Sequence, residues 1–329
     1  MIFILLFNYC TVSDYFMKII HYCNSFLNIQ IGQTKLICDP WVGTTFQNAW
    51  ISDPVHYNGV KIINKIKPNF IYISHLHCDH FDNYLLNRLS NKNVCIIIKK
   101  FKIPTLKNRI IKLGFKKILE LKPWSVKKLN KDVSISIVPQ MSNNTDDIES
   151  GIEYDLDTSI IIQSNKTQDV FYNNVDNPLS PHHIKKIKKF VKHNMKSDVK
   201  VCTFNIGAAS EYPQCFLNVK RKKEKNRIIN KTLKTTFKKL NILNPDIFFP
   251  SGGSYKISGK YFDLNKFVAL PDDNTLNKMN KRKFKIFNLI GGGSLTTDKT
   301  GFKLDLRKLN FSMNSNKIKR IKYGYEKEK

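Results

Sequence analysis

Three histidines and two aspartates lie within eight residues, directly after an apolar run that is typical of a β-strand. The segment from Phe70 to Asp82 reads Phe-Ile-Tyr-Ile-Ser-His-Leu-His-Cys-Asp-His-Phe-Asp, and it holds three of the chain's eight histidines. Neutral imidazole and carboxylate are the groups with which proteins bind zinc, and iron or manganese accept the same set. This segment therefore predicts a metal site at the end of a strand.

The spacing of these side chains indicates two groups of ligands. His75 and His77, two positions apart on an extended loop, can point to one ion, while Asp79 and His80 can face a second from the start of the next helix. Water bound by such ions ionises near neutral pH, and Asp79 would orient it or take its proton as the catalytic group. The alternative is that these are loop histidines with solvated or capping roles, which is the less favoured interpretation for this pattern after a strand.

Two neighbouring segments carry further candidate residues. Asp39 follows the predicted strand 35–38, and a carboxylate there can orient a metal-binding histidine through its ring N–H, although a simple turn acid is the alternative. The loop 41–54 contains Trp41 and Trp50 without a regular period. These tryptophans form either a substrate floor beside the metal or a small hydrophobic cluster.

Strands and helices alternate along the rest of the chain. The apolar periods predict strands at 17–22, 25–31, 35–38, 93–98, 117–121, 133–138, 157–163, 170–172, 199–205 and 245–250. They predict helices at 81–89, 106–113, 181–194 and 216–240. Because no repeat or linker is visible, we expect one domain over 17–310 and a basic tail over 311–329.

The first sixteen residues open with an apolar run that is too short to span a bilayer and lacks the basic region of a signal peptide. We interpret residues 1–16 as a leader or a wrongly assigned start, with Met17 as the true first residue. Seven cysteines without a Cys-x-x-Cys pair fit a reducing compartment, so we expect a cytoplasmic protein without a transmembrane segment.

The chain is strongly basic. Its 55 Lys and Arg residues against 26 acidic residues give a formal net charge of +29, which favours partners such as nucleic acid, nucleotides, sugar phosphates or anionic lipid. The alternative is the compositional bias of an AT-rich genome, since Lys, Asn and Ile are all abundant. The predicted helix 216–240 contains Lys220-Arg221-Lys222-Lys223, which forms either a solvated face or a stripe for a polyanion.

The segment His75-Leu76-His77-Cys78-Asp79-His80 resembles the signature of the metallo-β-lactamase superfamily. This resemblance implies an α/β fold in four layers, an αββα sandwich, with a one- or two-metal site at one edge. It also implies that Asp176, at the exit of the second predicted hairpin, is the aspartate that bridges the metals. The implied cofactor is zinc, as one or two ions, with iron or manganese as alternatives.

The resemblance covers about residues 17–310 and extends to one branch of the superfamily. The segments 38–50, 73–75, 174–176 and 209–215 resemble the lactamase-fold part of CMP-N-acetylneuraminate hydroxylase and, more distantly, ascorbate-phosphate lactonase. The chain has no Cys-x-His and Cys-x-x-His pair to hold a Rieske cluster. It therefore corresponds to a hydrolase of similar architecture or to the non-Rieske part of a two-protein oxygenase.

The chain departs from the superfamily pattern at two positions. Most two-metal members carry additional histidines near the positions that correspond to 138–140 and 251–253, and this chain has none there and none after His193. Either the site holds one metal, or another side chain replaces a histidine. The candidates are Gln140, Asp146 and Asp147.

These observations predict a metal-dependent hydrolase that acts on an anionic small molecule, with a nucleotide-linked or phosphorylated sugar as the expected type. The alternatives are the non-Rieske partner of a sugar-nucleotide oxygenase and a catalytically degenerate binding protein. A nuclease is less favoured, because such enzymes usually carry the additional histidines and a nucleic-acid-binding domain. The sequence indicates no particular oligomeric state.

Overall fold

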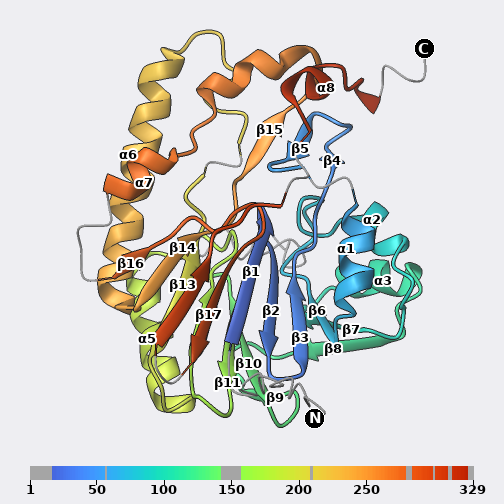
Figure 1. The fold of residues 1–329 in the computed structure, drawn as a ribbon, viewed down its shortest axis with the longest axis vertical. Helices are drawn as coiled ribbons and strands as arrows, with labels where there is room; N and C mark the ends of the chain where they lie inside the picture. The colour runs from blue at the N-terminus through green and yellow to red at the C-terminus, as the bar shows by residue number, and fades with distance from the viewer. Residues whose placement is uncertain are drawn as a thin grey trace, which may run out of the picture.

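Two large β-sheets packed face to face form the centre of the computed structural model (Figure 1). The structure describes residues 17–55, 58–141, 157–207, 210–278, 284–298, 301–309 and 313–324. The predicted leader, residues 1–16, lies outside this part of the chain. No helix in the described ranges is long and apolar enough to cross a membrane.

The first sheet has the strand order β18-β17-β1-β2-β3-β6-β7-β8. Its strands are β1 (Met17–Cys23), β2 (Phe26–Ile31), β3 (Thr34–Cys38), β6 (Phe70–Tyr72), β7 (Cys95–Lys99), β8 (Lys117–Leu121), β17 (Gly293–Asp298) and β18 (Gly301–Asp305). The strands from β18 to β3 pair antiparallel, and those from β3 to β8 pair parallel.

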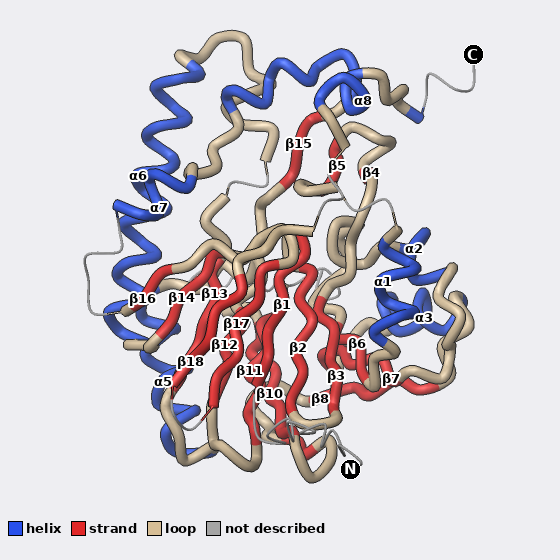
Figure 2. Tube along the Cα trace, in the orientation of Figure 1, coloured by secondary structure: helices blue, strands red, loops and turns tan. Residues whose placement is uncertain are grey.

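The second sheet has the strand order β16-β14-β13-β12-β11-β10-β9. Its strands are β9 (Lys127–Lys128), β10 (Val133–Pro139), β11 (Thr158–Ser164), β12 (Val170–Asn173), β13 (Val199–Phe204), β14 (Ile247–Pro250) and β16 (Lys285–Ile286). A small third sheet contains β4 (Thr44–Thr45), β5 (Trp50–Ser52) and β15 (Tyr255–Ile257), and Figure 2 shows it above the sandwich.

Strand β11 of the second sheet is buried on both of its faces. Its three consecutive isoleucines are fully buried because neighbouring side chains of a strand point to opposite faces. Ile160 and Ile162 lie in the core between the two sheets, whereas Ile161 lies in the core between the second sheet and its helices. A third core fills the space between the first sheet and the helices on its outer side. These layers confirm the predicted αββα sandwich.

The helices lie on the two outer faces and around one end of the sandwich (Figure 1). They are α1 (Gly59–Ile66), α2 (Asn83–Asn87), α3 (Thr105–Lys112), α5 (Pro181–Asn194), α6 (Arg221–Leu243), α7 (Asp273–Lys278) and α8 (Ser315–Lys319), with a 3-10 helix over Gly259–Phe267. Helix α6 buries Leu233, Leu240 and Leu243, whose spacing places them on one side of the helix.

Three local predictions differ from the structure. The helix predicted from residue 216 begins at Arg221, so the apolar residues before it lie in a loop. The loop 41–54 contains the short strands β4 and β5, which pair with each other and, through β5, with β15. The predicted tail contains α8, which packs Ile318 against Ile51 and Val55.

Helix α6 also carries a lysine whose charge opposes folding. Burial lowers the pKa of Lys239 to about 8, so the protonated amine destabilises the fold below about pH 8 and this penalty disappears as the pH rises towards 10.5. Replacing Lys239 with methionine should raise the free energy of unfolding at pH 7 by on the order of 1–2 kcal/mol. Urea unfolding should show this gain shrinking at pH 10. An equal gain at both pH values, or the same gain in a control Lys238→Met variant, would contradict this assignment.

Candidate metal centre

The strand ends explain why distant polar residues meet at one edge. Strands β3 and β6 run parallel in the first sheet, and β12, β13 and β14 run parallel in the second. The carboxyl ends of parallel strands lie at the same edge of a sheet. Asp39 follows β3, the histidine loop follows β6, Asp176 follows β12 and Asn205 follows β13, so all four reach the same end of the sandwich.

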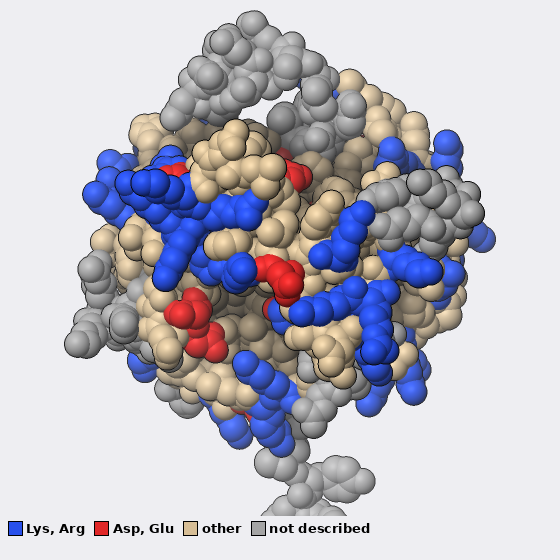
Figure 3. Space-filling view, turned by 90° about the horizontal axis from the view of Figure 1, so that it is seen from above, with Lys and Arg blue, Asp and Glu red and all other residues tan. Residues whose placement is uncertain are grey.

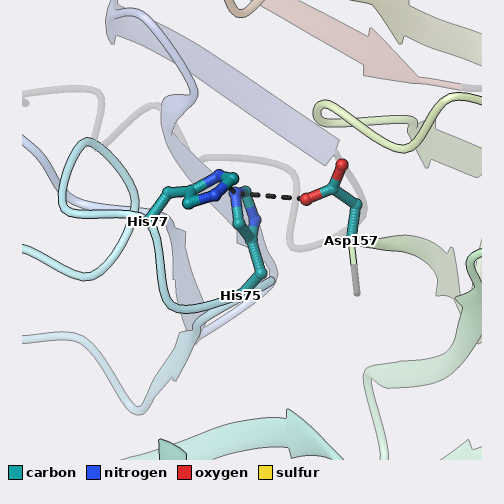
Figure 4. Close-up of side chains that lie close together, drawn as sticks. All are labelled: His75, His77 and Asp157. Carbon is teal, nitrogen blue, oxygen red and sulfur yellow. Dashed lines mark hydrogen bonds and ion pairs between the residues drawn. The ribbon is translucent and has the colours of Figure 1, made fainter. Parts of the chain in front are cut away.

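His75, His77 and Asp157 form the first cluster (Figure 4). The His75 Nε2 atom lies 2.8 Å from His77 Nδ1 and 3.2 Å from Asp157 Oδ1. One ligand atom of each residue lies within 4.8 Å of the others. Burial, reinforced by the charges of His80 and His77, lowers the pKa of His75 well below its ordinary value, which keeps its imidazole in the neutral form that binds metals.

Asp79, His80 and Asp176 form the second cluster. The His80 Nε2 atom lies 3.2 Å from Asp176 Oδ2 and 3.6 Å from Asp79 Oδ2. Burial alone would lower the pKa of His80, but the carboxylates of Asp79 and Asp176 raise it well above its ordinary value. A proton on His80 thus balances two carboxylates, and a cation at the same place would replace that proton.

The two clusters are neighbours. The ring centroids of His75 and His80 lie 4.2 Å apart, and both rings are fully buried. Together the clusters offer three imidazoles and three carboxylates, a donor set that suits zinc, iron or manganese. The residues of the predicted metal site therefore lie together in the structure, and their chemistry fits one ion or a pair of ions.

Asp39 is hydrogen-bonded to one histidine of the second cluster and, through Ser74, to one of the first. Its Oδ2 atom accepts hydrogen bonds from His80 Nδ1 at 3.0 Å and from the Ser74 hydroxyl at 2.6 Å. The Ser74 oxygen also lies 2.8 Å from His75 Nδ1. Asp39 therefore fixes the Nδ1 side of His80 directly and that of His75 through Ser74, leaving both Nε2 atoms towards the clusters. The structure places Asp39 beside a histidine, as the strand-end argument predicted.

Asp157 is the site residue that sequence reasoning missed. Strands β10 and β11 are antiparallel with Pro139 opposite Thr158, so residue 157 lies beside residue 140. The carboxylate beside positions 138–140 therefore comes from the facing strand and not from Gln140. Gln140 accepts a hydrogen bond from the Asp157 backbone N–H at 3.0 Å instead of joining the cluster. Asp146 and Asp147 lie outside the described residues.

Near residues 251–253, the second position at which the superfamily histidine is missing, two glycines lie against Asn205 and Asp176. Asn205 donates from Nδ2 to Asp176 Oδ1 at 2.8 Å and accepts from the Gly207 N–H, also at 2.8 Å. A Cβ atom on Gly252 would lie 2.9 Å from Asp176 Oδ1, and one on Gly253 would lie 2.7 Å from Asn205 Oδ1. Only glycine therefore allows this loop to approach Asp176 so closely. The position of Asn205 at a strand end was the available sequence signal.

Asn205 should hold Asp176 in the orientation that binds metal. Replacing Asn205 with alanine removes this hydrogen bond, and we expect a 10- to 100-fold loss of metal affinity, as is typical when a residue that orients a ligand is lost. Competition with a fluorescent chelator measures the affinity, and the exposed Asn91→Ala variant is the control. Unchanged affinity in Asn205→Ala with an intact fold would show that Asp176 needs no such support.

The two tryptophans of the loop 41–54 belong to a hydrophobic cluster. Trp41 is 1% exposed and packs with Tyr255, Ile257 and Val268. Trp50 stacks on Tyr255 with ring centroids 3.9 Å apart. These contacts are those of a small hydrophobic cluster, the second of the two interpretations of this loop. A contact between a substrate and the partly exposed Trp50 stays a prediction.

Comparison with known sequences gives short matches. None of the protein-family models compared with the sequence matches it. Over 92 residues the chain is 34% identical to a protein of Mycobacterium tuberculosis named as a Rieske 2Fe-2S iron–sulfur protein, covering 28% of this chain and 18% of that protein. Over 153 residues it is 26% identical to the cytidine monophosphate-N-acetylneuraminic acid hydroxylase of Asterias rubens, covering 44% of this chain and 21% of the hydroxylase. These matches thus span about a fifth of each relative's length.

Solved structures match over most of the chain. An isothiocyanate hydrolase from Delia radicum gut bacteria has a TM-score of 0.58 at 15% identity, covering 86% of this chain and 99% of its own. The metallo-β-lactamase fold protein YhfI of Bacillus subtilis has a TM-score of 0.50 at 11% identity, covering 86% of this chain and 100% of its own. CmlA, a diiron β-hydroxylase of Streptomyces venezuelae, has a TM-score of 0.50 at 13% identity, covering 86% and 54%.

The protein has the metallo-β-lactamase fold. The four layers, the strand-end site and the structural neighbours agree on this point. At these identities the neighbours establish the fold alone.

Proposed function

We propose that the protein is a metal-dependent hydrolase whose active centre is formed by the two clusters. The observation that supports this most directly is the convergence of six ligand side chains in two adjacent groups, in each of which the ligand atoms lie within 4.8 Å of one another. The proposed metal ligands are His75, His77, Asp157, Asp79, His80 and Asp176. Zinc is the first candidate metal, as one or two ions, and iron and manganese are the alternatives.

A metal bound there would supply Lewis acidity and lower the pKa of a coordinated water. The chain's own residues then have separate tasks. Asp79, which lies beside His80 in the second cluster, is the proposed general base that would orient an attacking water or accept its proton. Asp39 fixes the histidine rings, and Asn205 fixes Asp176.

The proposed substrate is an anionic small molecule. Lys and Arg side chains gather over much of the face seen from above in Figure 3, around a hollowed middle where a few acidic side chains show. Such a basic rim would attract an anion towards an acidic, metal-binding centre. The similarity to a hydroxylase of a nucleotide-linked sugar supports a nucleotide-linked or phosphorylated sugar as the first class to test.

The test is turnover by the metal-loaded protein. Zinc-loaded and chelated protein should be compared on esters, lactones, amides and phosphodiesters of phosphorylated or nucleotide-linked sugars. We expect hydrolysis of at least one class, with loss of turnover on chelation and recovery on metal addition. A folded, metal-loaded protein that hydrolyses none of these classes would overturn the proposal.

A second candidate function rests on Asp157. His75, His77 and Asp157 are two histidines and one carboxylate, the ligand set of many non-haem iron(II) oxygenases. The diiron β-hydroxylase CmlA shares the fold, and two sequence relatives are a Rieske protein and a hydroxylase. The second candidate is therefore the non-Rieske component of an oxygenase. Purified protein with bound iron that consumes oxygen when given an electron donor would favour it, and zinc with hydrolysis would exclude it.

A further inference from the structure

A groove at the start of helix α6 combines dense positive charge with exposed apolar side chains. We call it the α6 groove. It is a shallow depression, open to solvent, with a volume of about 760 Å³, and it is lined by Leu217, Val219, Lys220, Arg221, Lys222, Lys223, Asn226 and Phe267. None of these lining residues is acidic. In Figure 1 this end of α6 lies at the top left, on the face that Figure 3 shows from above.

The charge here exceeds what composition explains. Six of the eight residues over 220–227 are basic, whereas 55 of 329 are Lys or Arg in the whole chain. The single acid, Glu224, is already engaged, because its carboxylate pairs with Arg227 at 2.7 Å and accepts the Tyr212 hydroxyl at 2.7 Å. Lys220, Lys222 and Lys223 are exposed, and the groove that they line contains no acidic residue, so the local density of positive charge favours an anionic partner.

The loop before α6 exposes two large apolar side chains beside these cations. Leu217 is 86% exposed and Phe216 is 49% exposed. A single exposed leucine is common on protein surfaces, but here it stands next to four consecutive cations. Apolar side chains that insert among acyl chains, flanked by cations that meet anionic headgroups, are the two components of peripheral membrane binding.

We propose that the α6 groove docks the protein on an anionic lipid surface. Leu217 and Phe216 enter the headgroup region, and the cations of residues 220–223 contact the lipid phosphates and carboxylates. Nucleic acid fits these observations less well, because Leu217, the more exposed of the two apolar side chains, has no ring on which a base could stack. The Phe267 ring in the groove is already in contact with cations, since Arg221 lies 5.4 Å and Lys266 5.1 Å from its centroid. This inference does not depend on the proposed hydrolysis.

Vesicle sedimentation with the full chain tests the proposal. We expect binding to vesicles of phosphatidylcholine with phosphatidylserine, little binding to phosphatidylcholine alone, and weakening with salt. The Lys222→Glu, Lys223→Glu double variant should bind at least about tenfold more weakly, and Leu217→Ser should also lose affinity. The control Lys65→Glu, Lys112→Glu variant makes the same charge change on α1 and α3 and should bind like the wild type.

Three outcomes would overturn the proposal. The first is an equal loss in the control variant, which would attribute binding to net charge instead of the groove. The second is no preference for phosphatidylserine. The third is binding of an RNA oligonucleotide that depends on Lys222 and Lys223 while vesicles fail to bind. Circular dichroism of every variant establishes that a loss of binding is not a loss of fold.

Discussion

Replacing His77 with alanine should remove metal and turnover together. His77 contributes Nδ1 to the first cluster, 2.8 Å from His75 Nε2, and alanine leaves that cluster with one histidine and one carboxylate. Because a coordinated water would lose its activation, we expect turnover to fall by at least about a thousandfold. Metal content measured by mass spectrometry should fall by about one equivalent per chain.

The control for this variant is His182→Ala. His182 is an exposed histidine on α5 and belongs to neither cluster, so its loss should change neither metal content nor rate. Because the side chain of His77 is exposed, we expect His77→Ala to fold normally, and thermal unfolding measures whether it does. A His77→Ala protein that keeps turnover without metal would contradict the proposal of a metal-dependent hydrolase. Absence of metal from both well-folded proteins would favour a binding protein instead.

The second large effect concerns the choice of metal. Changing Asp157 to histidine converts the first cluster from two histidines and a carboxylate to three histidines. Imidazole suits zinc, whereas carboxylate oxygen also suits iron(II) and manganese(II). We therefore expect Asp157→His to raise the affinity for zinc relative to iron(II) by about tenfold or more. Competition between the two ions, followed by metal analysis of the protein, measures this ratio.

The Asp157→Glu variant is the matched control. It keeps the carboxylate, so the ratio of zinc to iron affinity should stay near that of the wild type even if both affinities fall. An identical ratio in the histidine and glutamate variants would remove Asp157 from the set of metal ligands. The same measurement on the wild-type protein separates the two candidate functions. A preference for zinc would favour the hydrolase, and a preference for iron would favour the oxygenase component.

The site residues that lie in one short segment of the sequence could be predicted from it. His75, His77, Asp79 and His80 occupy one short loop, so their spacing alone indicated the metal chemistry, and strand-end reasoning added Asp39. Asp157 could not be found in this way, because it reaches the cluster from the strand that faces residue 139, and only the register of β10 and β11 brings it there. The role of Asn205 beside Asp176 could not be predicted either, since an asparagine at a strand end has many structural uses.

The fold could be predicted in outline for a similar physical reason. The apolar periods defined most central strands and the outer helices, and together with the signature they indicated four layers. The short strands β4 and β5 could not be foreseen, because two or three residues without alternation carry no period and pair only through tertiary contacts. The start of α6 was predicted too early, since Phe216 and Leu217 look like the opening of an amphipathic helix but lie in a loop.

The pairing of β1 with β17 has a consequence for how the protein is made. These strands are neighbours close to the β18 edge of the first sheet, with Met17 opposite Thr297, although they lie far apart in the sequence. The turn after β1 is also bonded to the late loop, since Gly252 N–H donates to Asn24 O at 2.9 Å. A chain emerging from the ribosome therefore cannot complete this pairing until residues 293–298 have been synthesised. The histidine loop is thus synthesised more than 200 residues before the strands β17 and β18 that complete the first sheet.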